Sequence, residues 1–254
     1  MAIVFLDLDG TLLANGKPAK KARLALEKLH QNGHLAVAAT GRVPFLAKDI
    51  LADLHFTSHL CAAGSHVVHD GQVLFVREIE KSLLERFLAY CDAKNMDMVL
   101  ECVDDYVAYR KETEIPDIFA DYFHVPRAFV NREFHKNHTV LAFNIFDNDL
   151  IDDVRATFPE FQVNKAGPFG YDVNPAGDLK AEGMKLLVDY LKIPANEVYA
   201  IGDGHNDVHM IRDAYIGIAM GNAVPEAKAV ADYITTDVSE GGVYDALVHF
   251  GLIE

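Results

Sequence analysis

Two aspartates separated by a single residue close the first apolar stretch of the chain. Residues 3–8 are predicted to form a strand covered on both faces, and this strand runs into Asp7-Leu8-Asp9-Gly10-Thr11. Because side chains alternate along a strand, Asp7 and Asp9 are expected to face the same way, with Cα atoms about 6.6 Å apart. Open α/β sheets bind their ligands at the carboxyl ends of buried parallel strands, and Gly10 lets the chain turn away there. The motif therefore predicts a ligand site, with a solvated acidic turn as the alternative.

A second acidic segment, Gly202-Asp203-Gly204-His205-Asn206-Asp207, follows an apolar strand predicted at 198–201. It adds two carboxylates and a carboxamide at another strand end. Four converging carboxylates need a counter-charge, and a hard divalent cation such as Mg²⁺ accepts oxygen-only ligands. The alternative is a loop in which Gly, Asn and Asp serve the backbone alone.

Two further segments could supply donors and positive charge. Thr40-Gly41-Arg42 ends a predicted strand, and Lys180 begins a predicted helix, where an ammonium and a helix N-terminus both attract an anion. Singly, each has an ordinary explanation as a turn or a solvated lysine. Together they predict a phosphate site beside a metal.

The elements that must position these groups fall into three segments. Residues 1–78 and 178–254 alternate strands with amphipathic helices, which is typical of a parallel sheet in an α/β domain. Residues 79–177 contain strands joined by short connections, which is typical of an antiparallel sheet. We therefore predict an α/β protein with a Rossmann-like parallel-sheet core and an inserted α+β cap domain at 79–177.

The predicted elements of this split core and its cap are as follows. Core strands are expected at 3–8, 35–39, 59–62, 198–201, 216–219 and 233–234, and core helices at 19–32, 44–54, 179–191, 208–213, 223–230 and 243–250. Cap strands are expected at 98–102, 107–110, 139–146, 161–165 and 171–174, and cap helices at 81–94 and 148–158.

Composition limits the class of protein and its partners. The 254 residues carry 38 acidic side chains against 23 Lys and Arg, a formal net charge of −15, which argues against nucleic acid or an anionic membrane as partner. The three cysteines, Cys61, Cys91 and Cys102, are widely spaced and predict buried thiols in a reducing compartment. No apolar run approaches the roughly 18 residues of a membrane span, and the N-terminus lacks a basic signal region. A soluble, cytoplasmic protein is expected.

In chain order, four segments resemble the four motifs of the haloacid-dehalogenase-like hydrolases: Asp7-x-Asp9-Gly10-Thr11, Thr40-Gly41-Arg42, Lys180 and Gly202-Asp203-x-x-Asn206-Asp207. The resemblance spans nearly the whole chain. The insertion resembles a C2-type cap, and the tail segments Ile218-Ala-Met-Gly-Asn222 and Ala231-Asp-Tyr-Ile-Thr235 resemble the Cof-type sugar-phosphatase branch. One departure is Ala63-Gly64-Ser65, where that branch usually has Asn-Gly-Ala.

The resemblance implies a Mg²⁺-dependent phosphatase that acts on a small phosphorylated metabolite, such as a sugar phosphate, through an aspartyl-phosphate. Asp7 would be the nucleophile, and Asp9 the general acid and then the general base. The metal would be held by Asp7, the backbone carbonyl of Asp9 and Asp203, with Asp207 close by or bound through water. The phosphoryl oxygens would be held by the Leu8 backbone, Thr40, Gly41, Lys180 and Asn206.

Two other functions fit the same motifs. A phosphomutase would return the phosphoryl group to a sugar, and a non-catalytic phospho-aspartate receiver would signal through a changed surface. Asp9 and a cap of about 100 residues weigh against the receiver, which needs neither an acid nor a lid.

Several residues are interpreted without a catalytic role. The pairs His66/His69 and His135/His138 lack a completing ligand set and are interpreted as surface histidines. Phe119, Tyr122 and Phe123 are interpreted as cap core. His205 lies within the acidic loop and is weighed as a substrate contact.

Overall fold

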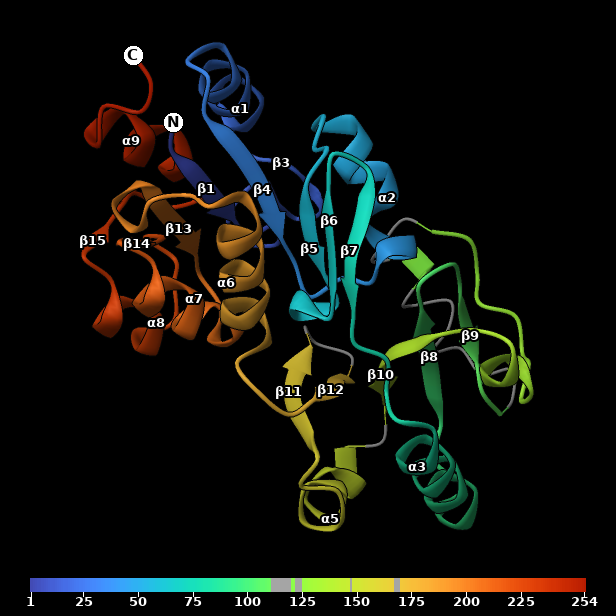
Figure 1. The fold of residues 1–254 in the computed structure, drawn as a ribbon. Coiled ribbons are helices and arrows are strands. Elements are labelled where there is room, and N and C mark those ends of the chain that lie inside the picture. The colour runs from blue at the N-terminus through green and yellow to red at the C-terminus, as the bar shows by residue number, and fades with distance from the viewer. Residues whose placement is uncertain (111–119, 122–124, 147, 167–169) are drawn as a thin grey trace. The chain divides into compact units, whose positions relative to one another are not determined.

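The computed structural model describes residues 1–110, 120–121, 125–146, 148–166 and 170–254 (Figure 1). The chain divides into two compact units, Met1–Gly41, Lys48–Val76 and Asp178–Glu254 forming the first, and Arg42–Ala47 and Arg77–Gly177 the second. The predicted α/β class with a parallel-sheet core is confirmed. Phe119, Tyr122 and Phe123, and the turn expected at Gly167 and Pro168, lie outside the described residues.

The first unit is built on an eight-stranded sheet in the order β15-β14-β13-β1-β4-β5-β6-β7. The strands from β15 to β5 are parallel, whereas β6 and β7 join antiparallel. The central strand β1 is wholly buried because its four residues are apolar and both its edges and faces are covered. The strand bounds are β1 (Ile3–Leu6), β4 (Leu35–Ala39), β5 (His59–Cys61), β6 (His66–His69), β7 (Gln72–Val76), β13 (Val198–Gly202), β14 (Ile216–Ala219) and β15 (Tyr233–Ile234).

The hairpin of β6 and β7 was not predicted. Its turn is Asp70-Gly71, and both residues have positive φ, 46° and 74°. Asp-Gly between two β-branched segments is a strong hairpin signal, so the sequence did carry the information. A second short hairpin, β2 (Leu13–Ala14) with β3 (Lys17–Pro18), was also missed.

The helices of the first unit follow the predicted apolar stripes. Ala22, Ala25, Leu26 and Leu29 of α1 are buried, and Ile3 and Phe5 of β1 pack in one cluster with side chains from α6 and α7. Helix α1 lies beside α9, and α7 lies between α6 and α8 (Figure 1). The helix bounds are α1 (Ala22–Gln31), α2 (Pro44–Asp53), α6 (Leu179–Leu191), α7 (Val208–Asp213), α8 (Pro225–Val230) and α9 (Gly242–His249). Within α2, the residues up to Ala47 are grouped with the second unit.

The second unit contains a five-stranded antiparallel sheet in the order β11-β12-β10-β8-β9. Alternate strand residues such as Leu100 and Phe143 pack with apolar residues of α3 and α5, and Phe87 of α3 stacks on Phe143 at 4.8 Å. Both helices therefore cover the same face of this sheet. The bounds are α3 (Lys81–Lys94), β8 (Met98–Cys102), β9 (Tyr106–Ala108), β10 (Val140–Ile145), α5 (Ile151–Thr157), β11 (Phe161–Ala166) and β12 (Gly170–Pro175).

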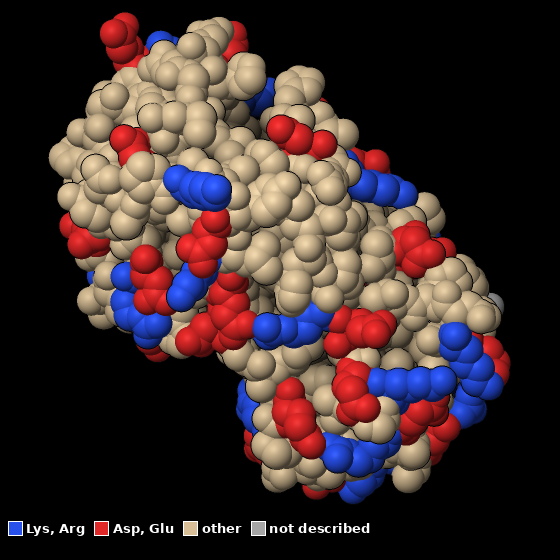
Figure 2. Space-filling view, in the orientation of Figure 1, with Lys and Arg blue, Asp and Glu red and all other residues tan. Residues whose placement is uncertain are grey.

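The surface and the cysteines can be compared with the composition. The three cysteines are buried free thiols, as predicted. On the face drawn in Figure 2, basic and acidic side chains are interspersed, and no broad area is basic alone. Within the described ranges, no helix combines the length and the apolar character needed to span a bilayer.

Candidate active site

The first strand ends one residue before Asp7, earlier than predicted. Strand β1 stops at Leu6, and the Asp7 amide still donates to the Ile201 carbonyl at 3.0 Å. The chain then turns, because the amide of Leu13 returns to the carbonyl of Leu8 at 2.7 Å. The prediction that Asp7 and Asp9 both lie in the first strand is therefore wrong: Asp7 continues the line of β1, and Asp9 lies within the turn.

Lys180 joins Asp7 to Asp207 inside the first unit. Its Nζ donates to Asp7 Oδ1 and to Asp207 Oδ1, both at 2.6 Å. Asp7, Lys180 and Asp207 are all buried, with 5%, 2% and 0% of their surfaces exposed. Lys180 reaches this position from the first turn of α6, so the lysine is a buried bridge between two carboxylates.

The electrostatics of this bridge favour a charged lysine. Burial by itself would lower the pKa of Lys180, but the carboxylates of Asp207 and Asp7 raise it above its ordinary value. Burial and the neighbouring Asp207 raise the pKa of Asp7 well above the usual aspartate value, while Lys180 opposes them. The ammonium is thus the group that opposes the rise in the pKa of Asp7.

Asp207 also organises the acidic loop that it ends. Its Oδ2 accepts hydrogen bonds from the amides of Asp203 at 3.0 Å and Gly204 at 2.9 Å. A Cβ on Gly202 would lie 2.5 Å from the Asp207 carboxyl carbon, so the loop closes tightly around this side chain. Both oxygens of Asp207 are therefore engaged within the protein.

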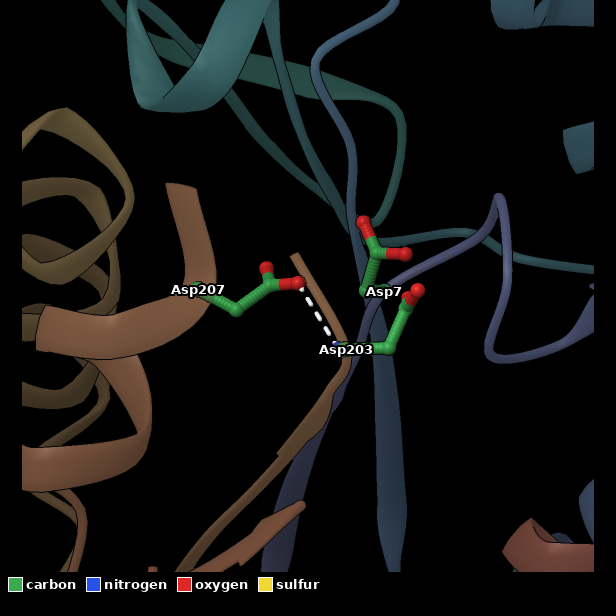
Figure 3. A group of neighbouring side chains, drawn as sticks. All are labelled: Asp7, Asp203 and Asp207. Carbon is green, nitrogen blue, oxygen red and sulfur yellow. Dashed lines mark hydrogen bonds between the residues drawn. The ribbon is translucent and has the colours of Figure 1, made fainter. Parts of the chain in front are cut away.

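Three carboxylates gather at this point (Figure 3). Oxygens of Asp7, Asp203 and Asp207 all lie within 4.8 Å of one another. Thr11 Oγ1 donates to Asp203 Oδ1 at 2.9 Å, and burial, reinforced by Asp207, raises the pKa of Asp203 to about 6. The carboxylate of Asp9 does not belong to this group, so the expected convergence of four carboxylates is corrected to three.

This group fits a hard divalent cation. Three carboxylates and one ammonium carry a formal charge of −2, and burial, with the charge of Asp207 as a second cause, raises the pKa of both Asp7 and Asp203. All donors are oxygens, which suits Mg²⁺. The charge of a divalent cation would balance the formal charge of this cluster.

The predicted phosphate ligands lie on the same sheet edge. Thr40 follows β4 and is buried, with its amide donating to Leu60 at 2.8 Å. A Cβ on Gly41 would lie 3.6 Å from Asn206 Nδ2, so the end of β4 and the acidic loop are neighbours. Leu8 is buried in the turn after Asp7.

One glycine sets how closely α6 approaches this edge. Gly64 has a φ of +100°, and a Cβ there would lie 2.1 Å from the Leu179 carbonyl oxygen and 3.1 Å from the Lys180 amide. The segment Ala62–Gly64 therefore touches the first turn of α6, immediately beside Lys180. In the sequence, Gly64 was identified only as part of the Ala63-Gly64-Ser65 departure from the family pattern, and its contact with α6 was not predicted.

The histidine interpretations need two corrections, one for His66 and one for His135, whose side chain is only 6% exposed. His66 is buried, with 4% of its surface exposed, and its ring stacks on His59 at 6.3 Å, so it is not a surface histidine. His69 is partly buried and pairs with Ser58 Oγ at 2.9 Å. His205 is exposed, and its Nδ1 lies 3.8 Å from Glu226 Oε2.

A cavity of about 620 Å³ lies elsewhere in the first unit. It opens beside the first residues of β4, Leu35 and Ala36, whereas Thr40 and Gly41 follow the other end of that strand. None of the predicted site residues lines it, so it is separate from the candidate active site.

Comparison with known proteins agrees with this geometry. The family model of the haloacid dehalogenase-like hydrolases matches residues 4–247. The YkrA protein of Bacillus subtilis (strain 168) is 31% identical, over 99% of this chain and 98% of its own. The 5-amino-6-(5-phospho-D-ribitylamino)uracil phosphatase YcsE of the same organism is 27% identical, over 98% and 96%.

A solved structure shares the fold over the whole length. The HAD subclass IIB sugar phosphatase BT4131 superposes with a TM-score of 0.85 and 27% identity, covering 100% of both chains. The family match spans both units, and the motif residues predicted from the sequence lie together on one sheet edge. The chain therefore belongs to the haloacid dehalogenase-like hydrolase family, as a phosphatase of its Cof-type branch.

Proposed function

We propose that this phosphatase is a Mg²⁺-dependent phosphomonoester hydrolase that passes the phosphoryl group of a small metabolite through Asp7 to water. The observation that carries the proposal is the buried bridge in which Lys180 Nζ lies 2.6 Å from both Asp7 and Asp207, with Asp203 beside them. Positioned charge of this kind performs most of the work in phosphoryl transfer.

Asp7 is the proposed nucleophile. Lys180 binds its Oδ1, and in the described part of the chain its Oδ2 accepts no hydrogen bond. The oxygen without a donor keeps its lone pairs for attack on phosphorus, while the ammonium favours the ionised carboxylate. Attack forms the Asp7–phosphorus bond and breaks the bond from phosphorus to the substrate's alcohol oxygen.

Asp9 is the proposed acid and base. In its protonated form it gives a proton to the departing alkoxide, which leaves as the alcohol. The resulting carboxylate then takes a proton from water, whose oxygen attacks the aspartyl-phosphate. Phosphate departs, Asp7 returns as a carboxylate, and Asp9 is protonated again.

The residues proposed to hold Mg²⁺ are Asp7, Asp203 and the backbone carbonyl of Asp9. When bound, the ion would offset the negative charge of the phosphoryl oxygens. Asp207 is proposed to contribute mainly by orienting Lys180 and the loop, since protein donors already engage both of its oxygens.

The residues proposed to bind the phosphoryl oxygens offer hydrogen-bond donors near the Asp7 nucleophile. Lys180 supplies positive charge, and the hydroxyl of Thr40 and the amide of Gly41 are the proposed donors after β4. A Cβ on Gly41 would lie 3.6 Å from Asn206 Nδ2, so the Asn206 carboxamide is a neighbour of this turn. The Leu8 amide follows Asp7 directly. Such donors stabilise the charge that develops on the transferring group.

We further propose that 1–78 and 178–254 form the catalytic core, with 79–177 as a C2-type cap that selects the substrate. The names of YcsE and BT4131 describe phosphatases of a ribitylamino compound and of sugars. Both names support a sugar phosphate or a similar polyol phosphate as the substrate of this chain.

The test is phosphate release from a panel of phosphorylated metabolites, measured with EDTA and with added Mg²⁺. We expect EDTA to abolish turnover, Mg²⁺ to restore it, and Ca²⁺ to support it poorly because its longer, more numerous bonds disturb in-line geometry. Full activity without metal would reject the Mg²⁺ assignment. A sugar phosphate isomerised without release of phosphate would indicate a phosphomutase instead.

A further inference from the structure

Asn222 connects three loops at the edge of the carboxylate cluster. Its Nδ2 donates to the Gly10 carbonyl at 2.8 Å and makes a longer contact, 3.4 Å, with Asp203 Oδ2. Its Oδ1 accepts a hydrogen bond from the Val238 amide at 2.9 Å. The side chain therefore joins the turn after Asp9, the acidic loop and the segment after β15.

The chemistry of this position requires a carboxamide. Both groups facing Nδ2 are acceptors, a carbonyl and a carboxylate, and the group facing Oδ1 is a donor. The two N–H bonds of one amide nitrogen can serve both acceptors, whereas an aspartate there would set oxygen against oxygen. An aliphatic side chain would leave all three groups without this partner.

The backbone on either side of Asn222 is tied to the acidic loop. The Met220 amide donates to the Gly202 carbonyl at 3.0 Å, and the Val224 amide donates to the Asp203 carbonyl at 2.9 Å. Gly221 also permits a close approach, since a Cβ there would lie 2.7 Å from the Asp237 amide nitrogen. These backbone hydrogen bonds therefore fix the position of Asn222 relative to Asp203.

Asp203 is consequently held on both of its oxygens. Thr11 donates to Oδ1 at 2.9 Å, and Asn222 contacts Oδ2. Gly10, whose carbonyl binds Asn222, has a φ of +92° and leaves only 2.3 Å between an ideal Cβ and Asp203 Oδ2. The turn that carries Asp9 and the loop that carries Asp203 are therefore locked to one another through Asn222.

We propose that Asn222 is a positioning residue that preforms the divalent-cation site. It does so by fixing the position of the Asp203 carboxylate relative to the Asp9–Gly10 turn. This inference rests on the proposed Mg²⁺-dependent function. Partners that orient metal ligands typically contribute tenfold to a hundredfold in metal affinity. Because Thr11 still holds one oxygen of Asp203, we expect the lower end of that range for loss of Asn222.

The test measures metal binding directly. Mn²⁺ is titrated into the metal-free full-length protein and followed by electron paramagnetic resonance, for wild type, Asn222→Ala and Asn222→Ser. Neither shorter side chain can bridge the three loops, and using both guards against one of them failing to fold. We expect the Mn²⁺ Kd to rise about tenfold in both.

Ser239→Ala is the matched control, in the exposed segment after β15 to which the Asn222 side chain bonds. Among the described residues, the Ser239 hydroxyl bonds only to Asp237, at 2.7 Å, so its loss disturbs the segment without touching Asp203 or Gly10. Its Mn²⁺ Kd should stay within twofold of wild type.

A second readout separates positioning from general damage. A bound cation orients Asp203 by itself, so saturating Mg²⁺ should restore most of kcat in the Asn222 variants. A variant that lost folded protein would instead show a reduced kcat at every Mg²⁺ concentration. The inference is overturned if the Mn²⁺ Kd of both variants matches Ser239→Ala, or if excess Mg²⁺ does not recover kcat.

The wild-type titration distinguishes failure of the proposed Mg²⁺-dependent function from failure of the inference about Asn222. Wild type that binds no Mn²⁺ and needs no metal for turnover would reject the proposed function and this inference with it. Wild type that binds Mn²⁺, together with Asn222 variants that bind it equally, would reject only the role of Asn222.

Discussion

Lys180 and Asp7 lie 173 positions apart in the chain, yet their side chains form a buried ion pair of 2.6 Å. The same ammonium bonds Asp207 at 2.6 Å, so one lysine compensates two carboxylates that are almost fully removed from water. Loss of the ammonium would leave both carboxylates buried without a counter-charge, which is strongly unfavourable. The stability of the fold and the proposed activity therefore involve the same side chain.

Replacing Lys180 by methionine should damage both stability and catalysis. Methionine nearly preserves the volume but leaves Asp7 and Asp207 unpaired, which should lower the free energy of unfolding by about 3–5 kcal/mol. Urea denaturation measures this loss, and Lys185→Met, at an exposed position on the same helix, is the control and should change it by less than about 0.5 kcal/mol.

The deficit of Lys180→Met should also depend on pH. A carboxyl whose pKa is raised in the folded state binds more protons than in the unfolded state, so it stabilises the fold as the pH falls through the folded pKa. Without the ammonium, the pKa of Asp7 should rise further. The difference from wild type should therefore shrink as the pH falls below neutrality, and a deficit that grows toward low pH would contradict the assignment.

Asp7→Asn should abolish turnover while keeping the fold. The amide nearly preserves shape but lacks the attacking oxygen anion, so kcat should fall by several orders of magnitude. The midpoint of thermal unfolding reports whether the fold is retained. A variant that keeps more than about a tenth of wild-type turnover would exclude Asp7 as the nucleophile.

Asp9→Asn should discriminate between leaving groups. General acid assistance is worth about 10²–10⁴ for an alkyl phosphate, whose alkoxide needs a proton, and less for p-nitrophenyl phosphate, whose leaving group does not. The measurement compares kcat/KM on both esters where phosphoenzyme formation limits this ratio. Equal losses on the two would mean that Asp9 is not the acid, and a long-lived phosphoenzyme would then favour a receiver.

Gly64→Ala should displace the start of α6. A Cβ would lie 2.1 Å from the Leu179 carbonyl oxygen, so backbone must move next to Lys180. Gly33→Ala is the matched control, since Gly33 also has a positive φ, +74°, but has open space around it. We expect about 1 kcal/mol of destabilisation for Gly33→Ala from its conformation alone, and about 2–4 kcal/mol for Gly64→Ala.

The two glycine variants should also differ in activity. Displacement of Lys180 should lower kcat/KM of Gly64→Ala by about tenfold to a hundredfold, whereas Gly33→Ala should retain wild-type kcat/KM. Similar kcat/KM values for the two variants would show that the contact between Gly64 and α6 does not position the lysine.

The secondary elements were largely predictable because their patterns are local. Helices α3, α6 and α7 begin and end at the predicted residues, since apolar periodicity and the flanking residues of a helix are properties of a short window. The Asp70-Gly71 hairpin had an equally local signal and was overlooked. The burial of His66 had none, because it depends on which side of β6 the rest of the sheet covers.

The sequence by itself determined which chemistry was available: aspartates, a threonine, a lysine and an asparagine, each next to a predicted strand end or helix start. Only the tertiary structure decided how these residues combine. Lys180 bridges Asp7 and Asp207, and the carboxylate of Asp9 stays outside the carboxylate group. Asn222 links Gly10 to Asp203. Asn222 and Gly10 are 212 positions apart, and Thr11 and Asp203 are 192 apart. Contacts at such separations follow from how the strands of the sheet pack side by side, and no periodicity along the chain encodes them.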